Sequence, residues 1–348
     1  MDKKPSGSGH MPCLSTPETV YIDITPFCNL RCKHCYSASA ARSNQKSFDA
    51  VCTLLDELTA AGVLRVAFVG REPLVRTDFP KILAYASRCG IATRLATNGT
   101  LVNAAVAKVL AASKIHSVQV SIDSASARRH NWLRGSEKAF DWAVKAIETL
   151  VQYDVRVCVS TTLSHYNYLE LHDIADLASD LGASHYRARL MIGNRRNNRL
   201  QITKEQYKQA VKVLLELRDY YKTMTVEQLH HWFLIDRAVP YCVDRDITIP
   251  CGAGLSKCSL THDFRVTPCI ALAHLFSSPI DKGIVEEWRN GKVFGQWRRI
   301  YSSLRGKCSV CGYRYLCGGG CRANVYGITG DINSSDPWCW FEPEGRYA

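Results

Sequence analysis

Residues 28–36 read Cys-Asn-Leu-Arg-Cys-Lys-His-Cys-Tyr, and this stretch decides how the rest of the chain is interpreted. It follows directly on the apolar run Val-Tyr-Ile-Asp-Ile at 20–24, which is typical of a buried strand. Cys28, Cys32 and Cys35 therefore place three soft thiolate ligands on one short loop. Such a set suits an iron–sulfur cluster, and because no fourth ligand is near in sequence, one metal position stays open for a substrate or cofactor. Three buried cysteines or part of a zinc knuckle are the alternative interpretation.

Strand-like and helix-like segments alternate after this loop. The predicted strands cover 20–25, 64–69, 92–97, 117–122, 156–161 and 184–190. The predicted helices cover 48–61, 78–89, 102–113, 138–153 and 168–181, and Gly62, Gly90 and Gly182 follow three of them as left-handed caps. Six such repeats predict an α/β fold with parallel pairing and right-handed crossovers, which is a partial (β/α)6 barrel of the TIM type. Its functional loops should lie at the carboxyl ends of the strands, where the cysteine loop falls.

The chain divides into three parts. Residues 1–16 are predicted to be a disordered tail that contains a run resembling a cloning remnant. Residues 17–236 form the predicted barrel, with one or two bridging helices over 201–235 and Thr203 as their N-cap. Residues 237–348 form a small cysteine-rich domain of short strands and turns, with the boundary near Arg237.

Composition limits the possible functions. Of 348 residues, 46% are hydrophobic, and the absence of a long apolar run or a signal peptide predicts a cytoplasmic protein with no membrane segment. Sixteen cysteines in such a protein indicate metal or cluster ligation rather than disulfides. The formal charge of +12 favours acidic partners, either nucleic acid or an anionic substrate and cofactor.

With an open cluster loop after the first strand, the sequence resembles the radical SAM enzymes, whose three-cysteine motif ends in an aromatic residue, here Tyr36. The resemblance implies that the open iron of a 4Fe–4S cluster binds S-adenosylmethionine through its amino and carboxylate groups. One electron then cleaves the sulfonium and gives a 5′-deoxyadenosyl radical.

The resemblance also implies cofactor contacts at the ends of the next three strands. Gly70-Arg71-Glu72-Pro73 is similar to the family's GGEP motif, in which Gly70 and Glu72 would hold the methionine amino group. Arg71 departs from that motif, because the family has a second glycine there. The other implied contacts are Asn98, the ribose-binding pair Ser121 and Asp123, and Arg134, which would pair with the methionine carboxylate.

The C-terminal part carries cysteines at the spacing C-x2-C-x5-C-x3-C, followed by one more, and resembles a SPASM domain. The resemblance implies two auxiliary 4Fe–4S clusters in addition to the first. Auxiliary cluster I would take Cys251, Cys258, Cys269 and Cys321. Auxiliary cluster II would take Cys308, Cys311, Cys317 and Cys339. If Cys258 is not a ligand, cluster I has an open iron, and two zinc sites are the alternative for the eight thiols.

Within this family the sequence resembles most closely the mycofactocin and pyrroloquinoline-quinone maturases. This implies hydrogen abstraction from a side chain of a ribosomally made peptide, ending in oxidation, decarboxylation or a cross-link, with the auxiliary clusters relaying electrons. The expected partners are a reductant such as flavodoxin or ferredoxin and a separate peptide-carrier protein. The alternative is a small-molecule substrate, either a tetrapyrrole side chain or a sugar-containing natural product. A nucleic-acid-binding protein with structural metal sites is less favoured, because charge is its only support.

One basic segment bears on the substrate. Arg187 and Arg189 share a face of the sixth predicted strand, and Arg195, Arg196 and Arg199 follow. At a barrel mouth these arginines would bind a carboxylate-rich substrate, since a guanidinium matches a carboxylate. A solvated basic loop is the alternative.

Overall fold

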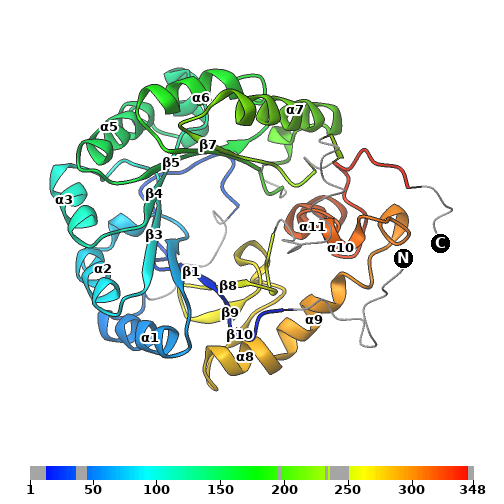
Figure 1. Ribbon diagram of the computed structural model, residues 1–348, viewed down its shortest axis with the longest axis horizontal. Helices are drawn as coiled ribbons and strands as arrows, with labels where there is room; N and C mark the ends of the chain where they lie inside the picture. Colours follow the sequence, from blue (N-terminus) through cyan, green and yellow to red (C-terminus); the bar gives the residue numbers. More distant parts are fainter. Residues whose placement is uncertain (1–12, 37–44, 194–196, 232–233, 236–250, 344–348) are drawn as a thin grey trace.

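The computed structural model describes residues 13–36, 45–193, 197–231, 234–235 and 251–343. One curved sheet of ten strands surrounds the centre of the molecule, and the helices α1, α2, α3, α5, α6 and α7 cover its outer face (Figure 1). The strand order is β10-β9-β8-β1-β2-β3-β4-β5-β6-β7, so the sheet is a partial barrel with two edges. Among the described helices, none is long and apolar enough to cross a membrane.

Six consecutive parallel strands confirm the predicted core of the barrel. They are β1 (Thr19–Asp23), β2 (Arg65–Val69), β3 (Ala92–Thr97), β4 (Ser117–Ser121), β5 (Val157–Leu163) and β6 (His185–Leu190). The predicted helices are also present, as α1 (Phe48–Ala60), α2 (Phe79–Arg88), α3 (Ala104–Ala112), α5 (Ala139–Gln152) and α6 (Leu171–Asp180). The regular alternation of periods along this part of the chain explains why these elements could be predicted.

Two elements of the barrel were not predicted. Helix α4 (Ala127–Arg134) has a polar sequence with no apolar stripe, and it ends at Gly135 in the left-handed conformation, with φ 70°. The bridging segment begins as predicted with α7 (Lys204–Tyr220), and the Thr203 side chain caps it in a capping box. The segment then forms β7 (Thr225–Glu227), parallel to β6, rather than a second helix.

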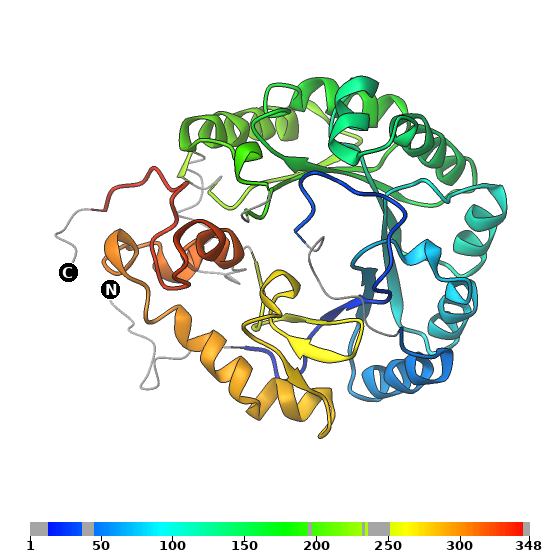
Figure 2. The same cartoon turned by 180° about the vertical axis from the view of Figure 1, so that it is seen from behind.

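The cysteine-rich part joins the same sheet. Strand β8 (Lys257–Leu260) pairs in parallel with β1, and β9 (Arg265–Thr267) and β10 (Ser278–Pro279) continue the sheet in antiparallel fashion. Helices α8 (Ile284–Asn290) and α9 (Lys292–Ile300) follow along the outside. Helices α10 (Arg314–Cys317) and α11 (Arg322–Thr329) lie at the opening of the barrel in both views (Figures 1 and 2). The predicted boundary at Arg237 lies outside the described residues.

The end of the predicted disordered tail is ordered. The backbone amide of Leu14 donates to Leu255 (2.9 Å), and the indole of Trp288 donates to the carbonyl of Leu14 (2.8 Å). The prediction of disorder is therefore wrong for residues 13–16, because backbone groups far apart in sequence satisfy this segment.

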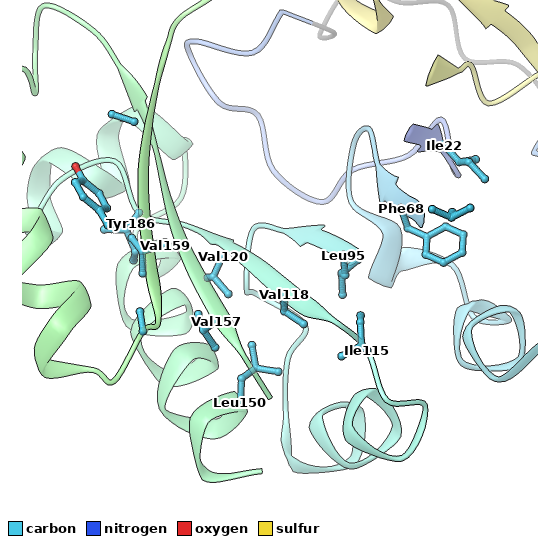
Figure 3. Packing of buried hydrophobic residues seen from close by; sticks show 14 of the residues in the cluster. Ile22, Phe68, Leu95, Ile115, Val118, Val120, Leu150, Val157, Val159 and Tyr186 are labelled. Atoms are coloured by element: carbon cyan, nitrogen blue, oxygen red, sulfur yellow. The ribbon is translucent and has the colours of Figure 1, made fainter. Parts of the chain in front are cut away.

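The main core lies between the sheet and the outer helices. Ile22, Phe68, Leu95, Val120 and Val159 are fully buried there (Figure 3). Because side chains alternate along a strand, the residues between these positions face the inside of the barrel. The inner face is therefore set by a different, more polar series of residues.

Candidate active site

The cysteine loop leaves β1 at the carboxyl edge of the sheet, as predicted. Cys28 is exposed, whereas Cys32 and Cys35 are half-buried. The amide of Leu30 points at the Cys28 sulfur (3.4 Å), and each thiol lies within electrostatic range of another. Burial raises the pKa of the Cys32 thiol to about 11, and the positive charge of Arg134 opposes that rise. Three thiols with an amide donor and a cation beside them fit an iron–sulfur cluster that takes three thiolate ligands.

Two neighbouring elements hold this loop. On one side, the Lys33 amide donates to the carbonyl of Leu133 in α4 (2.8 Å). A Cβ on Gly135 would approach the carbonyl oxygen of Arg31 to 2.8 Å, so that the close contact of α4 with the loop requires glycine. On the other side, the Asn98 side chain beyond β3 donates to the carboxamide oxygen of Asn29 (2.9 Å). Asn98, predicted to contact the cofactor, is thus also a support of the cluster loop.

Glu72 lies at the end of β2 and is completely buried. Its carboxylate accepts hydrogen bonds from the amide of Asn98 (2.7 Å), the hydroxyl of Thr97 (2.8 Å) and the amide of Leu74 (3.1 Å). Burial raises the pKa of Glu72 to about 7, and these donors oppose the shift. The Glu72 amide also donates to Phe27 (3.1 Å), so this residue connects β2, the loop and the end of β3. The predicted contact of Glu72 with the methionine amino group stays a prediction.

Gly70 explains how the chain tolerates Arg71. Its φ is 104°, and a Cβ at this position would lie 1.8 Å from Oδ1 of Asp23. Glycine is therefore required where β1 and β2 end side by side. The backbone at Arg71 does not require glycine, because the positive φ and the close approach to Asp23 both occur at Gly70.

Asp123 and Arg134 form a buried ion pair beside the cluster loop. The Nε atom of Arg134 lies 2.8 Å from Oδ2 of Asp123, and its Nη1 lies 3.9 Å from the sulfur of Cys32. Asp123 also accepts from the Thr162 amide (2.9 Å) and lies 3.6 Å from Nε2 of His34. Burial alone would raise the pKa of Asp123, but Arg134 holds it below its usual range. The prediction that Asp123 binds ribose does not agree with these contacts, because its carboxylate is occupied in orienting Arg134.

The remaining predicted contacts are placed at the same edge. Ser121 ends β4 with a half-buried side chain. Burial raises the pKa of Tyr36 well above its usual range, and the negative charges of Asp23 and Cys269 add to that rise. Tyr36 therefore lies within electrostatic range of both Cys35 of the first loop and Cys269 of the C-terminal part.

The C-terminal thiols gather in two pockets. Cys308, Cys311, Cys317 and Cys339, the predicted ligands of auxiliary cluster II, line the first pocket. Cys251, Cys269 and Cys321 line the second pocket, and Cys317 borders both. Among the described residues, no three His, Cys, Asp or Glu side chains converge as the ligands of one metal ion would. A pocket lined by four thiols fits a cluster of several irons, so the donor set of the first pocket suits the predicted group.

Cys258 is not part of either pocket, contrary to the prediction. It lies on β8 opposite Val20 of β1, is fully buried, and belongs to the core between sheet and helices. The other three thiols pack in a separate cluster that includes Trp297. Alternation along β8 is the physical reason, since it turns Cys258 toward the outer face together with Leu260. The second pocket therefore has Cys251, Cys269 and Cys321 as its own thiols and shares Cys317 with the first.

The sequence alone missed several residues of these sites. His34 lies 3.6 Å from the Asp123 carboxylate, and Nδ1 of His130 accepts from the Asp123 amide (3.1 Å). Burial lowers the pKa values of the two histidines to about 4 and about 3. His231 and Asp336 line the first thiol pocket. His34 could have been identified from its position between Cys32 and Cys35. The other three residues are distant in sequence and reach these sites only through tertiary structure.

The fold places three thiols that could hold an iron–sulfur cluster at the mouth of a partial barrel. A family model described as the radical SAM superfamily matches residues 22–181. Mycofactocin maturase MftC of Mycolicibacterium smegmatis is 30% identical over 335 residues, which cover 94% of this chain and 83% of that protein. The chain belongs to the radical SAM superfamily.

Other relatives extend over most of the chain. The AdoMet-dependent heme synthase of Methanosarcina barkeri is 29% identical over 343 residues, covering 94% of this chain and 98% of that protein. Among solved structures, Streptococcus suis SuiB bound to the precursor peptide SuiA superposes with a TM-score of 0.78 at 19% identity, covering 94% of this chain and 77% of that one. At that identity the likeness shows the fold alone.

Proposed function

We propose that this protein removes a hydrogen atom from a side chain of a ribosomally made peptide and so oxidises, decarboxylates or cross-links it. The observation that carries this proposal is the meeting of two kinds of thiol site at one barrel mouth. The loop of Cys28, Cys32 and Cys35 lies at the carboxyl edge, and Tyr36 directly after it lies within electrostatic range of Cys269 of the second pocket. The relatives named mycofactocin maturase and PqqA peptide cyclase support a peptide substrate.

Different residues of the chain would bind the cluster, bind the cofactor and position both. When bound, the reduced cluster and S-adenosylmethionine supply the 5′-deoxyadenosyl radical that takes the hydrogen atom. Cys28, Cys32 and Cys35 would hold that cluster, and Arg134, oriented by Asp123, would bind the methionine carboxylate. Glu72 keeps the ends of β2 and β3 together, and it would face the methionine amino group. The C-terminal thiols would hold auxiliary clusters that carry away the electron left on the product. The expected partners are flavodoxin or ferredoxin as reductant and a separate peptide-carrier protein.

A tetrapyrrole side chain is the second candidate substrate. The heme synthase of Methanosarcina barkeri matches this chain nearly end to end, over 98% of its own length. The basic inner face of the barrel would also suit propionates.

The experiment measures 5′-deoxyadenosine formed from S-adenosylmethionine by the reconstituted protein with dithionite. We expect the product in the unaltered protein and its loss in Cys32→Ala. Cleavage that survives in Cys32→Ala would refute the assignment of the loop. A peptide or a tetrapyrrole added to separate samples identifies the substrate class, because the true class should raise the rate and give a product altered in mass.

A further inference from the structure

We propose that the inner face of the barrel is a carboxylate-binding site that holds the anionic end of the substrate. The site consists of Arg94, Arg187, Arg189 and Lys257, which we call the inner basic cluster. This inference rests on the proposed function, because it assigns the part of the substrate that does not react. It predicts a substrate with at least two carboxylates, from acidic side chains and the C-terminus of a peptide or from the propionates of a tetrapyrrole.

The strand register places these side chains inside. Val159, Tyr186 and Ala188 belong to the core outside the sheet, so Arg187 and Arg189 of β6 point the opposite way. Arg187 donates to the carboxamide oxygen of Gln119 on β4 (3.1 Å), which spans the concave side of the sheet.

Two further side chains reach the same space from other strands. The ammonium of Lys257 on β8 lies 5.9 Å from the ring centroid of Tyr21 on β1. The thiol of Cys158 also faces inward, and burial raises its pKa. The positive charges of Arg187, Arg189 and Arg94 of β3 all oppose that rise, so Arg94 acts on the same space as the other two arginines. Cations from β3, β6 and β8 therefore share one interior.

The charges of the cluster are not balanced. Glu227 of β7 forms ion pairs with Arg189 and, at 3.8 Å, with Arg187. Among the described residues, the ion pairs of the cluster set one carboxylate against four cations, an excess of three positive charges. The side chain of Arg189 remains 45% exposed, so its guanidinium is open to a ligand.

The buried side chain of His230 is also affected by the positive charge of the inner basic cluster. Its Nε2 atom is buried and makes no hydrogen bond. Burial lowers the pKa of His230 to about 3, and Arg189, Lys257 and Arg322 contribute further. Arg322 lines the thiol pocket of Cys251, Cys269 and Cys321. The positive interior thus reaches from the barrel to that pocket.

The register also relates the cluster to the radical site. Arg189 pairs with Thr162, whose amide donates to Asp123. Arg187 pairs with Ser160, the partner of Ser121 on β4. Both arginines are therefore level with the residues at the cofactor edge, whereas Lys257 pairs with Thr19 at the start of β1. A carboxylate group held by these residues would leave the rest of the substrate at the mouth. Arg199 is exposed and is not part of the cluster, and Arg195 and Arg196 lie outside the described residues.

The test measures binding to the reconstituted protein with S-adenosylmethionine present. The probes are a glutamate-rich octapeptide with its glutamine counterpart, and a tetrapyrrole with free propionates with its methyl ester. We expect one of the two acids to bind and its neutral counterpart to bind at least tenfold more weakly. Arg187→Gln and Lys257→Gln should each weaken the acid at least tenfold, whereas Glu227→Gln should strengthen it because a competing carboxylate is lost.

Lys145→Gln is the matched control, because it removes one positive charge from a side chain on α5 that is 74% exposed. This variant should bind the acid as the unaltered protein does. Equal binding of acid and neutral probe, no binding of either acid, or equal loss in Lys145→Gln would overturn the proposal. The acid that binds identifies the source of the carboxylates. Formation of 5′-deoxyadenosine in the same unaltered preparation separates the two hypotheses. If it occurs while the binding pattern fails, only the inner basic cluster is refuted.

Discussion

Cys251 and Cys258 are the same residue type in the same part of the chain, but they lie in different environments. Both are cysteines of the C-terminal part, and the resemblance to a SPASM domain implied the same role for both. The structure places Cys251 in a thiol pocket and Cys258 in the hydrophobic core opposite Val20. The same limit applies to Asp123, whose ion pair with Arg134 joins two elements that the sequence could not place together. The three cysteines of the first loop could be predicted because their spacing is local.

The first prediction follows from that contrast. Cys258→Ala should keep the full iron content, because its side chain fills core space, and should cost about 1 kcal/mol of stability from the lost contacts. Cys251→Ala should lose about four irons per chain, the content of one cluster. Iron and sulfide analysis after reconstitution distinguishes the two variants. An equal loss of iron in both would restore Cys258 as a ligand.

At the scale of elements, periodic segments were predicted and contact-dependent ones were missed. The five outer helices of the barrel carry an apolar stripe, which identifies them without tertiary information. Helix α4 lacks such a stripe and depends on its contact with the cluster loop through Leu133 and Gly135. Strand β7 is only three residues long, too short for an alternating pattern. Its partner β6 decides its conformation.

The junction of β1 and β2 offers a second prediction. Gly70→Ala should be strongly destabilising, by more than about 3 kcal/mol, because its Cβ would collide with Asp23 in addition to the strain of a positive φ. Gly62→Ala is the matched control, since its φ is 77° but nothing lies within 4 Å of the added Cβ. That control should cost about 1 kcal/mol. Apparent melting temperatures that fall equally in both variants would contradict the role of the close approach.

For the whole molecule, buried histidines set the response to acid. Burial lowers the pKa values of His130 and His230 to about 3, so below about pH 6.5 the unfolded chain binds protons that the folded chain does not. Stability is therefore lost as the pH falls through this range. Glu72 acts in the opposite direction between its ordinary pKa and about 7, but it is a single group against the histidines.

The third prediction concerns this acid sensitivity. Between about pH 7.5 and about pH 5, His130→Gln should reduce the loss of unfolding free energy by about 2 kcal/mol. Urea denaturation at the two pH values measures the difference. His172→Gln, at an exposed position on α6, should leave the loss unchanged. An unaltered pH dependence in His130→Gln would show that this histidine is not kept neutral by burial.

The parallel pairing of β8 with β1 also has a consequence for biosynthesis. One edge of β1 pairs with β2 as soon as residues 65–69 have been made, but its other edge waits for residues 257–260. During that interval nearly two hundred residues leave the ribosome while β1 presents unpaired backbone groups, a template for association with other chains. The apolar Val20 and Ile22 lie on this strand. A nascent chain cut short before β8 should therefore need a chaperone.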